Sequence, residues 1–220
     1  MNVIIIGAGG HGKVVLDILQ HDSDADLIGF IDDDVTSHDK IIDGLRVLGS
    51  VNSLSKLIAV YKVDAAIIAV GDNKVRAELF DKMKGLGLKL KGAIHPDALI
   101  ARDVEVGEGV VIAAGAVINT GGRIGNNVII NTGAVLDHDD VIEDNAHISP
   151  GVKLAGRVTV GKYTHVGLGV TIVEDLTIGE NTTIGAGAVV LANIPANTTA
   201  VGVPARIIKH KSPSKNEASE

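Results

Sequence analysis

The side chains best suited to catalysis lie in one polar run, Asp137-His138-Asp139-Asp140. An imidazole with a reference pKa of about 6.5 is mostly neutral at pH 7 and can accept a proton, and an adjacent carboxylate orients the ring and raises its basicity. His138 is therefore a candidate general base, and Asp139 is its acidic neighbour. Neighbours along a strand point to opposite faces, so the pair can meet only where the chain turns a corner. The alternative is a solvated polar corner without a chemical role.

A second group of histidines follows this run. His147 comes nine residues after His138, and His165 comes eighteen residues after His147. Stacked histidines suggest a metal site, because imidazole is the commonest metal ligand, but a convincing site needs three ligands and a supporting second layer of hydrogen bonds. His138 would have to come from another chain to complete the set. A zinc site therefore stays an alternative interpretation. The preferred interpretation includes no metal.

The elements that must position these residues follow from a strict repeat. From position 100 to position 190 an aliphatic residue occurs at every sixth position: Ile100, Val106, Ile112, Ile118, Ile124, Ile130, Leu136, Ile142, Ile148, Leu154, Val160, Val166, Ile172, Ile178, Ile184 and Val190. Helices have a period of 3.6 and strands a period of 2, so a period of six indicates a solenoid that turns a corner every six residues. Eighteen residues then make one triangular coil. The repeat asks for a small or β-branched residue at position 140, where the sequence has Asp140.

The first hundred residues have a different pattern, in which apolar strands alternate with helical segments. Gly7-x-Gly9-x-x-Gly12 follows the strand Val3 to Ile6, and Asp32 lies twenty residues further on, which matches a dinucleotide fingerprint. The region is long enough for only one mononucleotide half. It therefore predicts a small parallel sheet that holds one nucleotide, with Asp32 or Asp33 accepting hydrogen bonds from the ribose or base. The alternative is a tight turn in a packing domain.

The amino-acid composition excludes several kinds of chemical site and several kinds of partner. The 220 residues carry a net charge of -7 and include no cysteine, which excludes disulfides, thiolate metal sites and a cysteine acyl-enzyme, and argues against nucleic acid or an anionic membrane as partner. We expect a cytoplasmic protein, since the first apolar segment is too short for a signal peptide or a membrane span. The expected organisation is an α/β nucleotide-binding domain at 1–97, a β-helix at 98–194, and a closing segment with a disordered tail at 195–220; the resemblance described below extends the ligand of the first domain to a nucleotide sugar.

Several motifs together resemble a known family. The hexapeptide Ile184-Gly185-Ala186-Gly187-Ala188-Val189 resembles those of left-handed β-helix acyltransferases. Gly-Ala-Gly-Gly-His-Gly-Lys from position 7, Val70-Gly71-Asp72-Asn73 and Val201-Gly202-Val203-Pro204-Ala205 resemble the group of sialic acid O-acetyltransferases and bacillosamine-pathway UDP-amino-sugar N-acetyltransferases. The resemblance implies a half-Rossmann-like α/β domain followed by a left-handed parallel β-helix, and a homotrimer with acetyl-CoA in the groove between coils.

The resemblance also implies roles for individual residues. His138 matches the general base, and Asp139 its acidic neighbour, which is Glu in the bacillosamine enzyme. His147 and Asn131 match residues near the acetyl group, and the backbone of Leu168 and Ala186 matches contacts to the CoA arm. The positions that match nucleotide-sugar contacts are Gly9, Gly10, His11, Asp32, Asp33, Gly71 and Asn73.

The function implied is direct acetyl transfer from acetyl-CoA to a nucleotide-linked 4-amino-4,6-dideoxy sugar, with UDP favoured, in the synthesis of bacterial surface polysaccharide or glycan. No metal cofactor is expected. O-acetylation of a sialic-acid-like sugar is the close alternative. Two other classes stay open at this stage: a γ-type zinc carbonic anhydrase and a noncatalytic solenoid scaffold.

Overall fold

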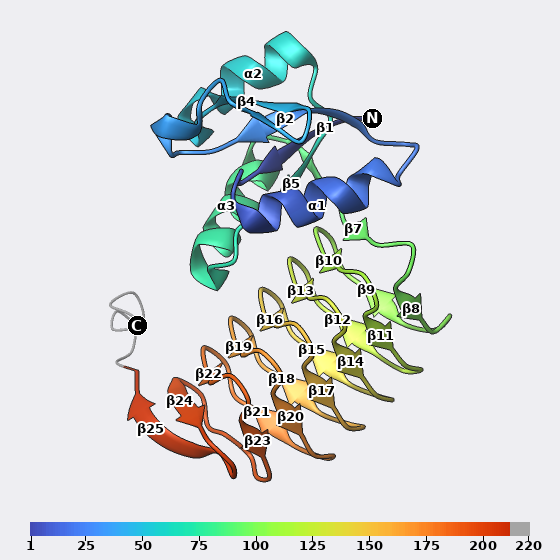
Figure 1. Ribbon diagram of the computed structural model, residues 1–220, viewed down its shortest axis with the longest axis vertical. Helices are drawn as coiled ribbons and strands as arrows, with labels where there is room; N and C mark the ends of the chain where they lie inside the picture. Colours follow the sequence, from blue (N-terminus) through green and yellow to red (C-terminus); the bar gives the residue numbers. More distant parts are fainter. Residues whose placement is uncertain (212–220) are drawn as a thin grey trace.

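The computed structural model describes residues 1–211, in which an α/β layer sits on one face of a long β-helix (Figure 1). The predicted disordered tail from residue 212 lies outside the described residues. The elements of the α/β layer are β1 (Asn2–Ile6), α1 (Gly10–Gln20), β2 (Asp26–Ile31), β3 (Ile41–Ile42), β4 (Leu45–Gly49), α2 (Leu54–Tyr61), β5 (Ala65–Ile68), α3 (Asn73–Gly85) and β6 (Lys89–Leu90), with short 3-10 turns at Val35–Ser37 and Val51–Ser53. The predicted helices and the three predicted strands of this layer are present.

These strands form one six-stranded sheet in the order β3-β4-β2-β1-β5-β6. All neighbours except the β3–β4 hairpin run parallel. The central strands are continuous apolar runs because helices cover both of their faces. Their carboxyl ends therefore meet at one edge, where parallel α/β sheets bind ligands.

Helices on the two faces of this sheet have different neighbours. On one face, α1 packs through Val15 and Leu19, and the same apolar cluster continues into Val111 and Ile129 of the β-helix. On the other face, α2 and α3 pack against the sheet, with Met83 wholly buried. The α/β layer is thus fixed to the β-helix by a shared core.

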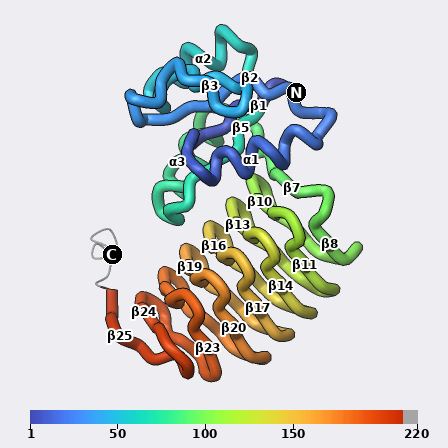
Figure 2. The backbone as a smooth tube through the Cα atoms, in the orientation of Figure 1, coloured from blue at the N-terminus to red at the C-terminus, as the bar shows by residue number. Residues whose placement is uncertain are grey.

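The β-helix has three parallel sheets, one for each side of a triangular coil (Figures 1 and 2). Sheet 1 contains β7 (Ala93–Ile94), β10 (Val111–Ile112), β13 (Ile129–Ile130), β16 (His147–Ile148), β19 (His165–Val166) and β22 (Thr183–Ile184). Sheet 2 contains β8 (Leu99–Ile100), β11 (Val117–Ile118), β14 (Val135–Leu136), β17 (Lys153–Leu154), β20 (Thr171–Ile172) and β23 (Val189–Val190). Sheet 3 contains β9 (Glu105–Val106), β12 (Arg123–Ile124), β15 (Val141–Ile142), β18 (Thr159–Val160) and β21 (Thr177–Ile178). Every strand pairs with the strand eighteen residues away, as the repeat predicts.

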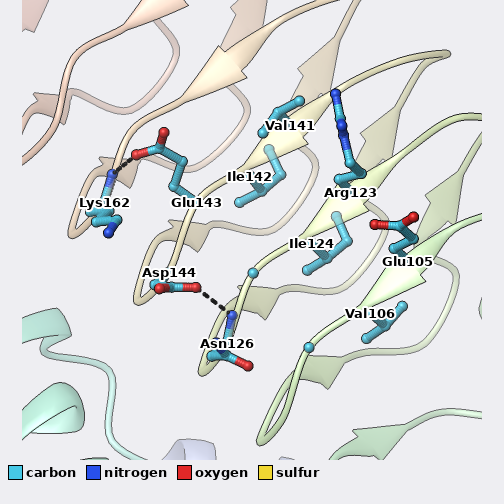
Figure 3. A pocket seen from close by; sticks show the side chains of 12 residues that line it. Glu105, Val106, Arg123, Ile124, Asn126, Val141, Ile142, Glu143, Asp144 and Lys162 are labelled. Carbon is cyan, nitrogen blue, oxygen red and sulfur yellow. Dashed lines mark hydrogen bonds between the residues drawn. The ribbon is translucent and has the colours of Figure 1, made fainter.

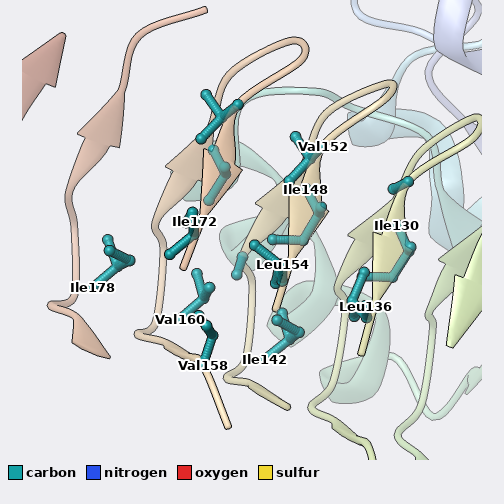
Figure 4. Close-up of a cluster of buried hydrophobic side chains, with 14 of the residues drawn as sticks. Ile130, Leu136, Ile142, Ile148, Val152, Leu154, Val158, Val160, Ile172 and Ile178 are labelled. Atoms are coloured by element: carbon teal, nitrogen blue, oxygen red, sulfur yellow. The ribbon is translucent and has the colours of Figure 1, made fainter. Parts of the chain in front are cut away.

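The second residue of each short strand points into the tube and builds the core. Ile130, Ile148 and Val166 follow one another on sheet 1 and are fully buried, and equivalent stacks line sheets 2 and 3 (Figure 4). Each such side chain contributes about 1.5–3 kcal/mol relative to an exposed one. The corners between strands are made by glycines and by residues such as Asn127 and Asn145, whose φ values of 57° and 60° lie in the left-handed region. The regular stack leaves functional side chains only on the outer faces and corners.

The far end of the stack is closed by β24 (Thr198–Val201), which pairs with β22, and by β25 (Arg206–His210), which pairs antiparallel with β24. At the near end, β7 already belongs to sheet 1 although it precedes residue 98. The domain limits at 97 and 194 stay predictions. Among the described residues, no helix combines the length and the apolar character that crossing a membrane requires.

Candidate active site

The run predicted to carry the general base forms a corner between β14 of sheet 2 and β15 of sheet 3. Asp137 organises this corner, since its Oδ1 accepts the His138 backbone N–H at 2.8 Å and the Asn119 amide at 3.0 Å. Asp139 adopts φ 61°, in the left-handed region that Asp tolerates better than most residues. The corner geometry that the sequence argument required is therefore present.

This corner brings the side chains of His138 and Asp139 together. The imidazole Nδ1 lies 2.9 Å from Asp139 Oδ2, and the two side chains are 43% and 60% exposed. An ionised carboxylate can only accept, so the neutral ring carries its proton on Nδ1 and keeps a lone pair on Nε2. The arrangement presents a histidine base that an incoming substrate can reach.

Two glycines, one coil away on either side, leave space for this pair. A Cβ at Gly156 would lie 2.5 Å from both Cε1 and Nε2 of His138. A Cβ at Gly121 would collide with the Asp139 carboxylate. Sequence reasoning missed both glycines, although adding or subtracting eighteen from positions 138 and 139 would have found them.

The coil above the pair also carries Arg157, which sequence reasoning did not single out. Its backbone N–H donates to the carbonyl of His138 at 2.9 Å, and its guanidinium makes a two-point ion pair with Asp175. The ion pair raises the pKa of Arg157, with a smaller contribution from the negative charge of Asp139. A fixed positive charge thus lies close to the carboxylate that orients His138.

Asp140, the polar residue at an apolar repeat position, points into the tube and is fully buried. Its Oδ1 accepts the Val158 backbone N–H at 2.8 Å, and its Oδ2 has no partner. Burial raises the pKa of this carboxyl to about 7. Asp140 therefore supports the corner from inside and does not face the outer surface where His138 lies.

His147 lies on sheet 1, beneath the α/β layer, and stacks on His165 as predicted, with ring centroids 4.7 Å apart. Burial lowers the pKa of His147 to about 3, and repulsion from His165 and His11 in their protonated forms and from the Arg76 guanidinium acts in the same direction. Its ring is therefore neutral at ordinary pH. Nε2 lies 3.4 Å from the Asn131 amide nitrogen, which joins the two residues expected near the acetyl group.

The two other residues expected to contact CoA follow β19 and β22, at the corner between sheets 1 and 2. Leu168 is 58% exposed, and Ala186 is exposed one coil further along. The Leu168 carbonyl accepts the Gly187 N–H at 2.8 Å. These residues line the corner next to His147, whereas His138 lies at the corner between sheets 2 and 3. One chain does not bring the two corners together.

The predicted nucleotide-sugar residues gather at the carboxyl edge of the α/β sheet, where they follow β1, β2 and β5. A Cβ added at Gly9 or Gly10 would meet nothing within 4 Å, and both glycines are exposed. Gly12, by contrast, has no room for a Cβ because of the Gly7 carbonyl. The turn alone therefore explains Gly12 but not Gly9 or Gly10, whose open backbone suits the approach of a phosphate.

The two predicted aspartates partly serve this turn. Asp32 accepts the Ala8 backbone N–H at 2.7 Å, and Asp33 accepts the Val51 N–H at 2.8 Å. The remaining acceptor capacity of each carboxylate is available for hydroxyl or base N–H groups.

His11, Gly71 and Asn73 lie at the boundary between the α/β layer and sheet 1. Burial and the charge of Arg76 lower the pKa of His11 to about 4, and its Nε2 is buried without a partner. The Asn73 amide donates to the Tyr163 carbonyl at 2.9 Å. A groove of about 310 Å³ runs beside them and is lined by Gly71, Asp72, Asn73, Lys74, Tyr163, His165, Asn181, Thr183 and Lys211.

A larger groove, of about 460 Å³, lies on the outer face of sheet 3 and contains none of the predicted site residues (Figure 3). Its polar walls carry both acidic and basic side chains. Asp144 accepts a hydrogen bond from the Asn126 backbone N–H, and Glu143 accepts one from the Lys162 backbone N–H. We find no catalytic arrangement there.

One group of side chains in the described part of the chain is spaced as metal ligands would be: Asp17, His21 and His95. However, His95 Nδ1 accepts the Asp97 backbone N–H at 3.0 Å. The neutral ring must then carry its proton on Nε2, which leaves no lone pair for an ion. Within one chain His138 lies at a different corner from His147 and His165, so the zinc alternative still requires a second chain to bring His138 to them.

Comparison with known proteins places the chain in a family. Residues 2–83 match the model described as the PglD N-terminal domain. PerB of Caulobacter crescentus, solved with CoA and GDP-perosamine, is 37% identical with a TM-score of 0.89, over 95% of this chain and 98% of that one. The chain belongs to the bacillosamine-pathway family of N-acetyltransferases. The acyltransferase class and the left-handed β-helix fold expected from the sequence are confirmed by this membership.

Two further members of the family support the assignment. The acetyltransferase domain of PglB from Neisseria gonorrhoeae is 33% identical with a TM-score of 0.87, over 94% of this chain and 99% of that one, and it has also been solved with acetyl coenzyme A. UDP-N-acetylbacillosamine N-acetyltransferase of Bacillus subtilis is 40% identical over 116 residues, which is 51% of this chain and 51% of that protein. The alignment thus spans about half the length of this curated relative.

Proposed function

We propose that the chain transfers the acetyl group of acetyl-CoA to the amine of a nucleotide-linked 4-amino-4,6-dideoxy sugar, with His138 as general base. The observation that carries this proposal is the His138 ring, which Asp139 holds through Nδ1 at 2.9 Å while Nε2 stays free on an exposed side chain. The solved relatives that contain CoA with GDP-perosamine support the choice of substrates.

The chemistry needs no covalent enzyme intermediate. The sugar amine adds to the thioester carbonyl, His138 Nε2 takes the amine proton, and the tetrahedral intermediate collapses as the C–S bond breaks and CoA leaves as the thiolate. The thiolate then takes up a proton. A positioned base of this kind contributes about 10² to 10⁴ in rate. No cysteine is required, in agreement with the composition.

His147 and Asn131 are placed to hold the acetyl carbonyl. Because the pKa of His147 is lowered to about 3, the ring is neutral and carries one N–H at neutral pH; to donate to the acetyl oxygen this proton has to lie on Nε2, the nitrogen that faces Asn131, rather than on the buried Nδ1. A neutral donor stabilises the oxyanion of the intermediate without first having to lose a proton to solvent. Leu168 and Ala186, exposed on the adjoining corner, would receive the CoA arm along their backbone.

The nucleotide is proposed to bind at the carboxyl edge of the α/β sheet. Gly9 and Gly10 open the start of α1 to a diphosphate, and the first turn of α1 carries no acidic residue that would repel it. Asp32 and Asp33 would accept hydrogen bonds from the ribose or base. UDP is the first choice, since the Bacillus subtilis relative acts on a UDP-linked sugar by name, and GDP is the second.

The separation of the two corners supports the homotrimer that the family resemblance implies. His138 lies between sheets 2 and 3, while His147, Leu168 and Ala186 lie on sheet 1 and its corner with sheet 2, so a neighbouring copy must supply one half of each site. The outer face of sheet 2 supports such packing, because its first residues toward the near end are apolar: Leu99, Val117 and Val135. A closed ring of three copies would complete three sites.

We place the enzyme in the cytoplasm, where acetyl-CoA and nucleotide sugars are made, and in the synthesis of surface polysaccharide or glycan. The deciding experiment is a thiol-release assay with acetyl-CoA and a panel of UDP-, GDP- and dTDP-linked 4-amino sugars, with the matching 4-hydroxy sugars and a sialic-acid-like sugar as controls. CoA release with one amino sugar supports the proposal. Release only with hydroxyl acceptors would replace it with O-acetylation, and no release with any acceptor would favour a noncatalytic scaffold.

A further inference from the structure

Arg76 is the largest side chain that the structure buries almost completely. It lies in the first turn of α3, its residue is 1% exposed, and its guanidinium forms no ion pair within residues 1–211. Burying a charge without a counter-ion costs free energy, even when every donor is hydrogen-bonded. A buried guanidinium without a counter-ion is therefore a candidate for a role in the proposed substrate site, through its contacts or its charge.

On one side, the guanidinium and its neighbour Asn73 hold the corners of three successive coils. Arg76 Nε donates to the Asn127 carbonyl at 3.0 Å, and Nη2 donates to the Asn145 carbonyl at 2.8 Å. Asn73 accepts from Nη2 at 2.8 Å and donates to the Tyr163 carbonyl at 2.9 Å. Positions 127, 145 and 163 are eighteen residues apart, so the pair fixes α3 to a defined column of the β-helix.

On its other side, Arg76 holds the loop after β5. Nη1 lies 3.2 Å from the Val70 carbonyl and 3.3 Å from the Gly71 carbonyl. Nη2 also reaches the carbonyl of Ala146 at 3.2 Å, in the peptide that leads into His147. One planar group therefore connects the loop proposed to bind the nucleotide sugar with the strand proposed to hold the acetyl group.

Its charge acts on the same region. Arg76 is among the causes that lower the pKa values of His11, His147 and His165, and so helps to keep these rings neutral. No acidic residue lies in the first turn of α3 or of α1. Asp72, at the N-cap of α3, offsets part of the Arg76 charge, but no ion pair within residues 1–211 neutralises it.

We propose that Arg76 is a positioning residue for acetyl transfer, which sets the nucleotide-sugar loop at Gly71 relative to His147 and supplies positive charge for the diphosphate. This inference rests on the proposed function. The guanidinium fork is essential to it, because a lysine can keep the charge but cannot hold both sides at once. Arg76 need not touch the substrate.

The test compares Arg76→Lys and Arg76→Met with Arg102→Lys, a control at an exposed arginine. We expect Arg76→Lys to raise KM for the nucleotide sugar about 10-fold and lower kcat about 10- to 100-fold, because misplacement by about 1 Å can cost about 10² in rate. KM for acetyl-CoA should stay within about 2-fold, since the CoA corner is not held by Arg76. Arg76→Met should in addition weaken binding of the free nucleoside diphosphate, measured by calorimetry, and reduce its salt dependence.

A purely structural role would lower kcat in proportion to the folded fraction and leave both KM values unchanged, and that result would overturn the proposal. If Arg76 variants do not fold, Asn73→Ala keeps the arginine but removes one side of the clamp, and it should raise KM for the nucleotide sugar selectively. An unchanged KM in Asn73→Ala would then count against the proposal. The calorimetric arm is independent of turnover: equal nucleoside diphosphate binding by wild type and Arg76→Met refutes the role of Arg76 even if acetyl transfer itself is not observed.

Discussion

The α-carbon of Gly156 lies so close to the imidazole of His138 that a single methyl group there would come within 2.5 Å of Cε1 and Nε2. The glycine is one coil from the histidine, so the stacking of the β-helix itself creates the space that the base occupies. We therefore expect activity to be sensitive to Gly156, although this residue has no functional group.

Gly156→Ala should lower kcat about 10- to 100-fold with little loss of stability. The methyl group meets the end of a side chain that can rotate away, so the fold adapts while the base moves off its position. Steady-state kinetics and thermal unfolding measure both effects. Gly85→Ala is the matched control, since a Cβ at Gly85 meets nothing within 4 Å. A Gly156→Ala enzyme with normal kcat would show that the ring is not held where catalysis needs it.

Asp140→Asn should be more stable than wild type by a margin that grows as the pH rises. The folded-state pKa of Asp140 is raised by burial from 3.8 to about 7, so the folded protein holds a proton that the unfolded chain releases. The free energy of unfolding of wild type therefore falls between about pH 4 and pH 7 and does not fall further above pH 7. The total loss is at most about 4 kcal/mol, because one pKa unit corresponds to about 1.36 kcal/mol. Asn keeps the acceptor for the Val158 N–H and does not ionise.

Urea unfolding at several pH values and one protein concentration checks this prediction, with Asp81→Asn on the exposed surface of α3 as control. The difference between Asp140→Asn and wild type should grow up to about pH 7 and then level off. A difference that does not change with pH would mean that Asp140 is ionised in the folded protein. The charge of Asp137 raises the pKa of Asp140, and the charge of protonated His138 lowers it.

The ring of His147 should not titrate between pH 5 and pH 8. Burial lowers its pKa to about 3, while an unfolded histidine titrates at about 6.5. Stability is then lost as the pH falls below about 6.5, because the unfolded chain binds a proton that the folded chain does not. NMR of the imidazole C–H signals, assigned with His147→Gln, measures the pKa directly. A midpoint near 6.5 would disprove a neutral His147 in a dry environment.

Mixing two inactive variants should restore activity if each site is shared between copies. His138→Ala lacks the base, and His147→Ala lacks the group proposed for the acetyl carbonyl. In randomly mixed trimers about a quarter of the interfaces combine an intact His138 with an intact His147 of a neighbour. When equal amounts of the two variants are dissociated and reassembled together, the mixture should regain about a quarter of wild-type turnover. Activity no higher than in the separate variants would place both residues in one chain's site.

The repeat made the β-helix predictable because a period of six leaves only one regular arrangement, and every aliphatic position from Ile100 to Val190 obeys it. The β3–β4 hairpin at 41–49 was missed, since its strands are short and half exposed and the Asp43-Gly44 turn is a weak local signal. The contact between His138 and Asp139 depended on a corner conformation that the repeat already placed there.

Contacts that join distant parts of the chain were harder to predict. The role of Arg76 depends on carbonyls 51 to 70 residues away, and nothing in the polar sequence of α3 distinguishes this arginine from a surface residue. The inward direction of Asp140 illustrates the same limit. Its departure from the repeat marked the corner that carries His138 and Asp139, but the carboxyl points into the tube rather than toward the outer surface.

The most direct test of the account is the turnover of His138→Ala with acetyl-CoA and the preferred amino sugar. We predict that kcat falls about 10²- to 10⁴-fold, the contribution of a positioned base, while the dissociation constant of acetyl-CoA changes by less than about 2-fold. Turnover within a few-fold of wild type in a folded His138→Ala protein would contradict the assignment of His138 as the general base.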